Sequence, residues 1–201
     1  MDVFEAIYTR RSIKSFDPNH RLSMEEEMRL LEATIQAPTS FNVQHWRFVI
    51  LRDPALRKKI REEFGRNQPQ ITDASLLILL AADLKAWQKK PERYWRNLPE
   101  KIATSVVSAI HDFYKGREWL QRDEAQRSIG MAAQNLMLAA KALGYDSCPM
   151  IGFDLDEVSK LVKLPEDYVI GPMIAIGKKL KEPWPKPGQL PLEELVFENH
   201  F

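Results

Sequence analysis

Three short segments of the chain concentrate side chains that could bind a small anionic or polar molecule. The first, residues 10–14, carries Arg10, Arg11, Ser12 and Lys14. Arginine donates paired hydrogen bonds to phosphate oxygens, so these cations together with a hydroxyl group could hold a phosphate dianion. The alternative interpretation is a charged helix end that interacts favourably with the helix dipole.

The other two segments lie at the ends of expected regular elements. Residues 37–46 combine hydroxyl and amide side chains in a loop between a helix and a strand, where they could hydrogen-bond the edge of a polar ring. A helix stop followed by a turn would need the same residue types. Residues 148–154 join a strand to a helix, and Gly152 allows a ligand to approach the backbone closely. A plain strand-to-helix turn is the alternative there.

Other familiar chemistries have no visible residues to carry them out. The sequence contains no glycine-rich dinucleotide fingerprint, no phosphate loop, no zinc-protease helix and no serine-hydrolase elbow. The four histidines are scattered without metal-ligand spacing. The single cysteine, Cys148, lies in an expected strand, where a buried structural thiol is more common than a nucleophile. We therefore expect no metal site and no hydrolytic side-chain chemistry.

Composition narrows the setting in which the protein works. Lys and Arg number 29 against 28 Asp and Glu, which is not the basic balance of a nucleic-acid binder. The short cation run at residues 178–181 is typical of a solvated surface. The longest apolar run, residues 76–82, is too short to span a bilayer, and the first residues lack the features of a signal peptide. A single cysteine suits a reducing compartment. We expect a cytoplasmic protein without nucleic-acid or membrane partners.

Local signals predict helices that alternate with a few strands. Ser23 and Glu26 form a capping box at the start of a helix that Pro38 ends, and Asp53 with Pro54 starts another. Apolar residues at helical spacing in the first two helices are Phe4, Ile7 and Tyr8, and then Met24, Met28, Leu31 and Ile35. Further helices are expected over residues 54–64, 84–120 with interruptions at Pro91 and Pro99, 123–143 and 154–164. Strands are expected over residues 47–51, 75–82, 145–150 and 173–177.

The two most regular elements should build the core. Strand 75–82 is apolar throughout, which is typical of a strand buried on both faces. Helix 123–143 has one continuous apolar face, and Gly144 follows as a good terminator. The residues of that face are Ile129, Ala132, Leu136, Ala140 and Leu143.

The chain is expected to form one domain, residues 1–181, followed by an extended arm, residues 182–201. Prolines at four positions of the arm prevent it from folding into a helix or a central strand. The apolar residues Leu195, Val196 and Phe197 near its end have no core of their own. The arm therefore needs another surface on which to bury them.

Together, in this order and spacing, the three segments resemble the flavin-binding signature of the nitroreductase family. Residues 10–16 resemble its R-R-S-x-[RK]-x-F element, and residues 38–46 resemble its P-[ST]-S-x-N-x-Q-x-W element. The N-Q-P-Q segment at 67–70, the I-G-F-D turn at 151–154 and the L-P-L element at 190–192 also fall where family members carry them. The resemblance covers essentially the whole chain and is closest to the small bacterial branch of NAD(P)H nitroreductases.

The resemblance implies an α+β fold of the FMN-dependent nitroreductase type. This fold is a three-layer α/β/α sandwich whose central sheet is mixed and mostly antiparallel. Residues 1–181 would be the FMN-binding domain. The C-terminal arm would be exchanged in a homodimer with shared active sites, which would give its apolar end the missing surface.

The resemblance also implies noncovalent FMN and no catalytic side chain, because the flavin itself carries the chemistry. The phosphate, ribityl chain and pyrimidine edge would be held by Arg10, Arg11, Ser12 and Lys14. The ribityl and pyrimidine portions would also contact Asn67 and Gln70. The second subunit would contribute Pro38, Thr39, Ser40, Asn42 and Gln44. The reactive side of the ring would be bordered by Pro149, Ile151 and Gly152, with a backbone N–H of Ile151 or Gly152 facing the flavin N5.

One position departs from the family pattern. Family members commonly carry an arginine before the closing L-P element, where it reaches the FMN phosphate, whereas this chain has Gln189. Glutamine donates hydrogen bonds but has no charge. Lys186, three residues earlier, could supply the missing charge because its side chain is long and flexible.

The function implied by the resemblance is transfer of hydride from NADH or NADPH, through flavin N5, to an electron-poor small molecule such as a nitroaromatic or a quinone. The cycle would be ping-pong, with donor and acceptor using the same space in turn. Aromatic residues between Trp87 and Trp119 could line the acceptor pocket or pack within their own helices. Two alternatives remain open: another flavin reaction, such as dehalogenation or enoate reduction, and a non-catalytic FMN-binding module that senses redox state or binds a partner.

Overall fold

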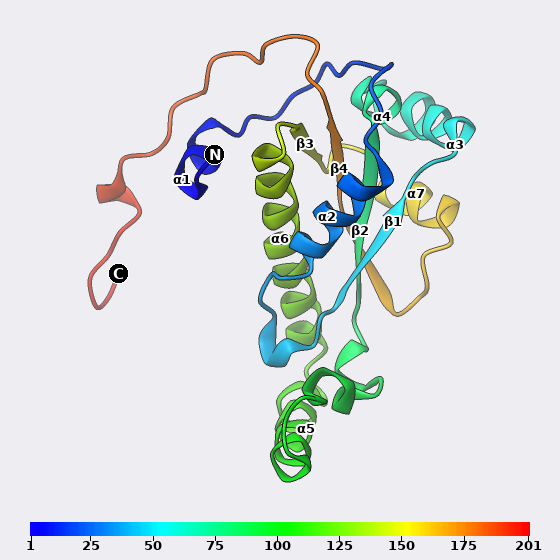
Figure 1. The fold of residues 1–201 in the computed structure, drawn as a ribbon. Helices are drawn as coiled ribbons and strands as arrows, with labels where there is room; N and C mark the ends of the chain where they lie inside the picture. Colours follow the sequence, from blue (N-terminus) through cyan, green and yellow to red (C-terminus); the bar gives the residue numbers. More distant parts are fainter.

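A four-stranded sheet lies at the centre of the protein in a computed structural model that describes all 201 residues (Figure 1). The order of the strands is β1-β2-β4-β3, and all three pairs are antiparallel. The sequence led us to expect a mixed, mostly antiparallel sheet, but the four strands are wholly antiparallel, and the single parallel contact is an isolated bridge between Ser12 and Ser147 at the β3 edge. The strands are β1 (Trp46–Ile50), β2 (Leu76–Asp83), β3 (Asp146–Met150) and β4 (Tyr168–Gly177).

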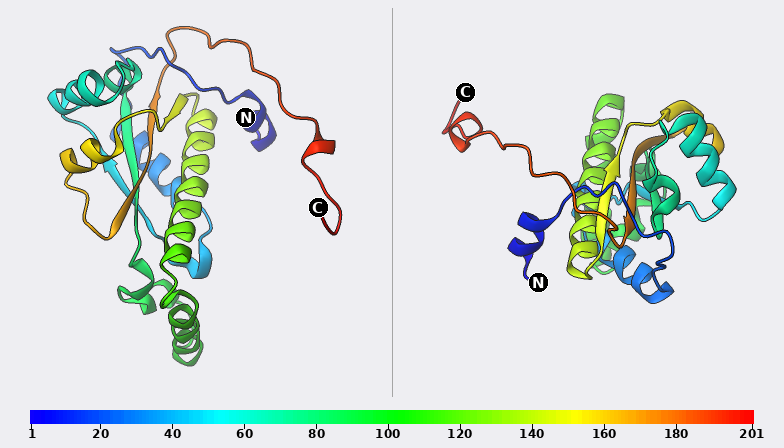
Figure 2. Two further views of the ribbon diagram at one scale, coloured as in Figure 1. Left: turned by 180° about the vertical axis from the view of Figure 1, so that it is seen from behind. Right: turned by 90° about the horizontal axis from the view of Figure 1, so that it is seen from above.

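Helices on both faces of the sheet complete three layers (Figure 2). One face is covered by α2 (Met24–Thr34) and α6 (Glu118–Ala142). The other face is covered by α3 (Pro54–Lys59), a π-helical turn (Ile60–Phe64), α4 (Gln70–Asp73) and α7 (Leu155–Leu161). Because side chains alternate along a strand, Ile78 of β2 packs in the first layer and Leu77 in the second. The expected α/β/α sandwich is confirmed.

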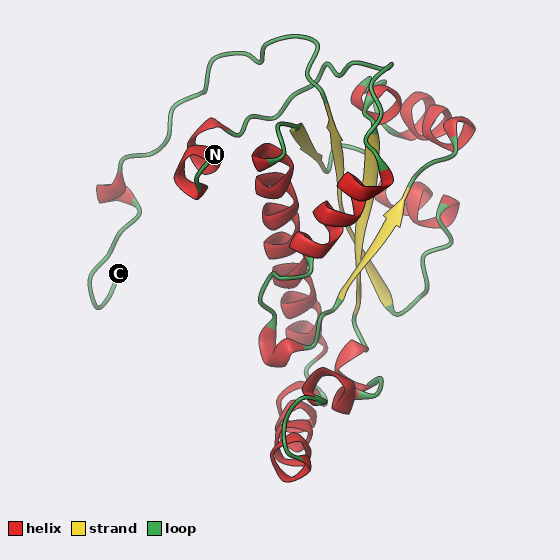
Figure 3. Cartoon of the chain, viewed as in Figure 1, coloured by secondary structure: helices red, strands yellow, loops and turns green.

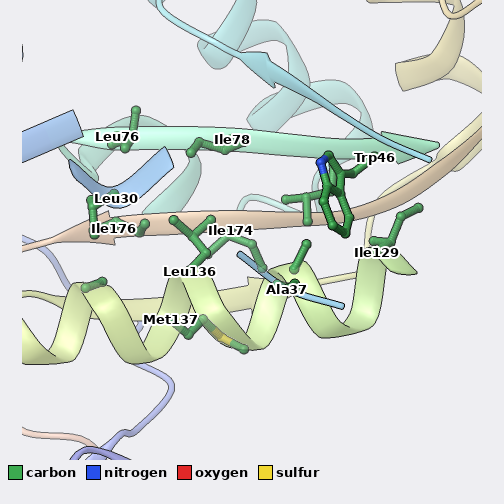
Figure 4. Close-up of a cluster of buried hydrophobic side chains, with 14 of the residues drawn as sticks. Leu30, Ala37, Trp46, Leu76, Ile78, Ile129, Leu136, Met137, Ile174 and Ile176 are labelled. Carbon is green, nitrogen blue, oxygen red and sulfur yellow. The ribbon is translucent and has the colours of Figure 1, made fainter. Parts of the chain in front are cut away.

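The long helix α6 forms the larger part of the core. Ile129 and Leu136 pack against Ile78 and Ile174 of the sheet (Figure 4). The predicted apolar face is confirmed, and Gly144 adopts a φ of 77° directly after the helix, which suits its predicted role as terminator. The helix begins at Glu118 rather than at residue 123, because no proline or capping residue interrupts the chain between these positions.

The strand predictions hold within one residue at each end, except for β4. This strand starts at Tyr168, whereas the sequence predicted a start at residue 173. Leu79 pairs with Met173 but Ala81 pairs with Ile170, so β4 carries an extra residue at this point. The bulge contains a proline, which has no N–H for the ladder, and this interruption conceals the first half of the strand in the sequence.

Helix α2 does not bury the apolar residues that recur along it at helical spacing. Its buried residues are Glu27, Leu30 and Thr34, whereas Met24 and Met28 are exposed. Glu27 tolerates burial because Arg52 Nη1 donates a hydrogen bond to its carboxylate at 3.1 Å. The apolar side of α1 (Val3–Thr9) is exposed as well, with Phe4 at 65%. Both helices thus present apolar surface that nothing in the single chain covers.

A small lobe, residues 86–114, projects beyond the end of the sheet (Figure 3). It contains two 3-10 turns, Ala86–Gln88 and Pro91–Trp95, and α5 (Glu100–Tyr114). The predicted interruptions at Pro91 and Pro99 are confirmed, since each proline lies at the start of a new element. Trp87 and Tyr114 are buried within the lobe and are therefore packing residues rather than pocket walls.

The arm, residues 182–201, leaves the domain in an extended conformation and runs past α1 (Figure 2). Its only regular element is a 3-10 turn at Leu192–Glu194. Leu195, Val196 and Phe197 are all more than half exposed. Separately, none of the helices has both the length and the apolar composition required to cross a membrane.

Candidate functional site

The first polar segment lies against the β3 edge of the sheet in an extended conformation. Helix α1 ends at Thr9, and the N–H of Ile13 donates to the carbonyl of Ser147 at 3.0 Å. The Ile13 side chain is buried in the core, so alternation along the extended backbone exposes Ser12 and Lys14 on the opposite side. A buried hydrophobic residue thus fixes the direction of the polar side chains on either side of it.

A cleft of about 660 Å³ opens between this segment and the base of the arm. Arg11, Ser12 and Lys14 line one side, and Lys181 and Trp184 line the other. Arg11 Nη2 donates to the carbonyl of Trp184 at 2.6 Å, which ties the arm to the segment. Three of the four residues predicted to hold the phosphate, Arg11, Ser12 and Lys14, therefore share one cationic cleft, and Arg10 is not part of its lining. Sequence reasoning missed Lys181, because the run at residues 178–181 is indistinguishable from a solvated surface.

Three buried polar atoms at this end of the sheet have no hydrogen-bond partner. They are Nη1 of Arg10, Oε1 of Gln70 and Oγ of Ser147. Gln70 is 1% exposed, and its Nε2 donates to Oε1 of Gln68 at 3.0 Å. Each unpaired buried group costs about 1–3 kcal/mol. An unpaired donor and an unpaired acceptor together are the pattern expected where a polar ligand completes the hydrogen bonding.

Cys148 lies between these groups and the core. Its Sγ is 4.0 Å from Nε2 of Gln70. Burial raises the pKa of the Cys148 thiol, and the positive charges of Lys14 and Arg10 oppose that shift. Cys148 is buried, as predicted for a structural thiol. No three His, Cys, Asp or Glu side chains are grouped so that they could hold a metal ion.

The third segment follows β3 at the same end of the sheet. Pro149 and Ile151 are exposed, and the N–H groups of Ile151 and Gly152 donate no backbone hydrogen bond within the chain. Gln68 Nε2 donates to the carbonyl of Gly152 at 3.0 Å, so the segment is held against residues 67–70. Asn67 is exposed and adopts a left-handed φ of 54°. Gln68 is a supporting residue that only its place in the N-Q-P-Q segment could have revealed.

The second segment forms a loop with a strained backbone. Phe41, Asn42 and Gln44 have φ values of 51°, 53° and 52°, which L-residues rarely adopt. The backbone N–H of Gln44 donates to Oγ1 of Thr39 at 3.0 Å, and Asn42 Nδ2 donates to the carbonyl of Tyr94 in the lobe at 3.1 Å. Such strain persists only where the surroundings enforce it, and it is common at binding sites.

The second segment lies far from the other two within one chain. Next to it, His45 Nδ1 lies 3.2 Å from Ser128 Oγ, near the middle of α6. Close to the first and third segments, Lys141 Nζ lies 3.1 Å from Asp146 Oδ1, near the end of α6. The part of α6 between these contacts is roughly 20 Å long at 1.5 Å per residue. Within a single chain, the first and third segments therefore lie together, and the second segment lies apart from them.

The residues of the two groups can now be stated. The β3 end of the chain carries Arg10, Arg11, Ser12, Lys14, Asn67, Gln70, Pro149, Ile151 and Gly152. The lobe end carries Pro38, Thr39, Ser40, Asn42 and Gln44. Gln189 belongs to neither group, because it is exposed on the arm. Lys186 Nζ donates to the carbonyl of Tyr8 at 2.8 Å, so within this chain its charge is directed at α1.

Comparison with known proteins identifies the class to which this fold and these residues belong. Residues 7–178 match the model of the nitroreductase family, and the chain therefore belongs to that family. The chain is 65% identical to the protein DrgA of Synechocystis over 98% of its own length and 95% of the relative's length. It is 32% identical to YodC of Bacillus subtilis, named provisionally as an NAD(P)H nitroreductase, over 97% and 96% of the two chains.

Solved structures agree with this assignment. A crystal structure of a provisionally named nitroreductase from Exiguobacterium sibiricum in complex with FMN superposes with a TM-score of 0.91. The two chains are 28% identical, and the match covers 99% of this chain and 98% of that one. The family resemblance and the fold class inferred from the sequence are both confirmed.

Beneath the strained loop, His45 is buried as a neutral imidazole. Desolvation lowers the pKa of His45 from 6.5 to about 4, and the charge of Asp83 only partly opposes this shift. The unfolded chain therefore binds one more proton than the folded chain as the pH falls below 6.5. The free energy of unfolding should fall by about 1.4 kcal/mol per pH unit from this group, until the pH approaches 4.

Replacing His45 with glutamine removes this proton uptake, so His45→Gln should show a shallower loss of stability between pH 6.5 and 4. Urea unfolding of both proteins across this window measures the difference. His111→Gln is the matched control, because that imidazole is 53% exposed. Parallel pH profiles for the wild type and His45→Gln would contradict a neutral buried His45.

Proposed function

We propose that the protein is a homodimeric FMN-dependent oxidoreductase that takes hydride from NADH or NADPH and passes it to an electron-poor small molecule. Membership of the nitroreductase family supports this proposal, as do the NAD(P)H in the name of YodC and the FMN in the Exiguobacterium complex. The observation that carries it is the unpaired pair of buried atoms, Arg10 Nη1 and Gln70 Oε1, beside a cationic cleft. A ligand with a polar ring edge and a phosphate matches both features.

The residues at the β3 end fit the parts of FMN. Arg11, Ser12, Lys14 and Lys181 would hold the phosphate, because the cleft presents cations and a hydroxyl group together. Arg10 and Gln70 would hydrogen-bond the pyrimidine edge, which offers both a donor and acceptors. Asn67 would contact the ribityl chain. FMN, when bound, would supply the hydride-transfer chemistry, so that hydride passes from the nicotinamide to the acceptor in a ping-pong cycle.

The third segment would border the ring on its reactive side. The N–H groups of Ile151 and Gly152 have no backbone acceptor within the chain, so either is available to donate toward N5. Pro149 and Ile151 would exclude water from the adjoining surface. Because Gln68 holds the carbonyl of Gly152, this backbone is oriented before any ligand binds.

The loop at residues 38–44 would complete the site of the other subunit. It cannot reach the β3 end of its own chain, because α6 separates the two. The exposed apolar residues of α1, α2 and the arm supply surface for a second copy to cover. The arm would cross to the partner, where Leu195, Val196 and Phe197 would become buried. Whether Gln189 or Lys186 then reaches a phosphate depends on that crossing.

The cofactor assignment is tested by releasing and reloading the chromophore. Denaturing the purified protein should release FMN, and the holoprotein should oxidise NAD(P)H with a quinone or a nitroarene as acceptor. Gln70→Leu removes the unpaired acceptor and should weaken FMN binding roughly tenfold, measured by titration of the apoprotein. Gln134→Leu, at an exposed position of α6, is the control. Release of FAD, or equal affinities for all three proteins, would contradict the assignment.

The shared site is tested by mixing two inactive variants. Arg10→Ala with Arg11→Ala disables the β3 end of the site, and Asn42→Gly disables the loop, where glycine accepts the left-handed backbone without strain. In a mixed dimer both defects fall in one site and the other site is intact. Random reassortment should therefore restore roughly a quarter of the wild-type activity. A site built within one chain predicts no restoration.

A further inference from the structure

A second cationic cleft lies at the other end of the molecule, between the loop at residues 38–44 and the lobe. Its volume is about 480 Å³. Arg47, Arg93 and Arg96 line it, and no carboxylate side chain does. It is separate from the cleft at the base of the arm, which has no residue in common with it.

The positive charge of this cleft is not neutralised by its surroundings. Arg47 Nη2 lies 3.2 Å from Oδ2 of Asp83, but Lys89 Nζ also binds that carboxylate at 3.0 Å, so Asp83 is shared between two cations. Arg93 and Arg96 are exposed and form no ion pair. Arg93 Nη2 donates instead to the hydroxyl of Tyr94 at 2.7 Å. Several unpaired cations in a concave surface attract anions more strongly than isolated ones do.

The cleft adjoins the loop assigned above to the flavin. Asn42 and Gln44 form part of its lining, and Gln44 Nε2 donates to Oδ1 of Asn42 at 3.2 Å. Asn42 is in turn tied to the carbonyl of Tyr94. A molecule that reacts beside this loop would therefore have the three arginines within reach of its more distant groups.

We propose that this cleft binds the phosphates of the nicotinamide nucleotide while the nicotinamide ring lies at the flavin of the partner subunit. The proposal rests on the function proposed above. A dinucleotide carries its phosphates at a distance from the ring that donates hydride, which matches a cationic cleft next to the loop rather than inside the flavin site. The chain has no glycine-rich phosphate-binding turn, so side-chain cations must supply the affinity for phosphate.

The experiment compares donors that carry the same reactive ring with and without phosphates. NADPH, NADH and the phosphate-free N-benzyl-dihydronicotinamide are each used to reduce the FMN-loaded protein in a stopped-flow instrument. The variants are Arg93→Ala combined with Arg96→Ala, and Arg122→Ala as a control that removes one exposed cation from α6. Arg47 is left intact because its loss would leave the buried Asp83 with one partner fewer.

The double variant should raise the dissociation constant of NADPH by roughly tenfold or more relative to that of the benzyl compound. The limiting rate of reduction should change little, because the arginines bind the donor without touching the reacting atoms. An equal effect on NADH assigns the cleft to the pyrophosphate, and a larger effect on NADPH assigns it to the additional ribose phosphate. Rising ionic strength should weaken the binding of NADPH to the wild type, so that its dissociation constant approaches that of the double variant.

Two results would overturn the proposal. The first is that the double variant loses as much affinity for the phosphate-free donor as for the phosphate-bearing donors. The second is that the double variant binds every donor normally and loses affinity only for a sulfonated quinone acceptor. Calorimetric titration with inorganic pyrophosphate tests the cleft without any flavin chemistry, and the double variant should bind it more weakly than Arg122→Ala does. If no donor reduced the FMN bound to the wild type, the proposed function would be wrong. The pyrophosphate titration would still show whether the cleft binds phosphates.

Discussion

The packing of α6 on the sheet is the interaction on which the rest of the molecule depends. Ile129 and Leu136 are almost fully buried against Ile78 and Ile174, and burial of such side chains contributes about 1.5–3 kcal/mol each. A helix of 25 residues held in this way is a rigid spacer. It contacts His45, next to the strained loop, through Ser128 near its middle, and it ends close to the extended segment at residues 10–14. No rearrangement of the loops alone could bring these two groups together.

This constraint explains why so much apolar surface remains open in the single chain. Phe4 on α1, Met28 on α2 and Phe197 on the arm are each more than half exposed. Scattered exposed hydrophobic residues are ordinary, but here they gather on the elements that flank the incomplete site. Under the proposed function the same contact between subunits would bury this surface and complete both sites. Assembly and cofactor binding would then stabilise one another.

The sequence was sufficient wherever local chemistry decides the structure. The capping box at Ser23 and Glu26, the buried strand β2 and the helix end at Gly144 all follow from neighbouring residues, and all three are confirmed. The spacing of apolar residues gave a wrong prediction where tertiary contacts decide which face of a helix is buried. The regular spacing of Met24 and Met28 concealed that α2 turns Leu30 toward the core.

The candidate site shows the same division between local and distant information. Motif order located its segments, because each segment is continuous in the chain. The contribution of Lys181 could not be found in this way, since it depends on the arm returning beside Arg11. The cationic cleft at the lobe was equally hidden, because Arg47 and Arg93 come from different elements. Contacts between segments far apart in the chain leave no local pattern to recognise.

The distribution of charge shows how a nearly neutral chain can handle anions at two places. The excess of Lys and Arg over Asp and Glu is a single residue, so attraction to an anion cannot come from the net charge. Instead, carboxylates are absent from the lining of the lobe cleft, and the arm cleft has Glu182 as its only acid. Salt at about 0.1 M screens each exposed charge beyond roughly 10 Å, so an anion responds to the lining of a cleft and hardly to the rest of the surface. Under the two proposals above, separate cationic clefts would bind a flavin phosphate and a nucleotide phosphate without making the whole protein basic.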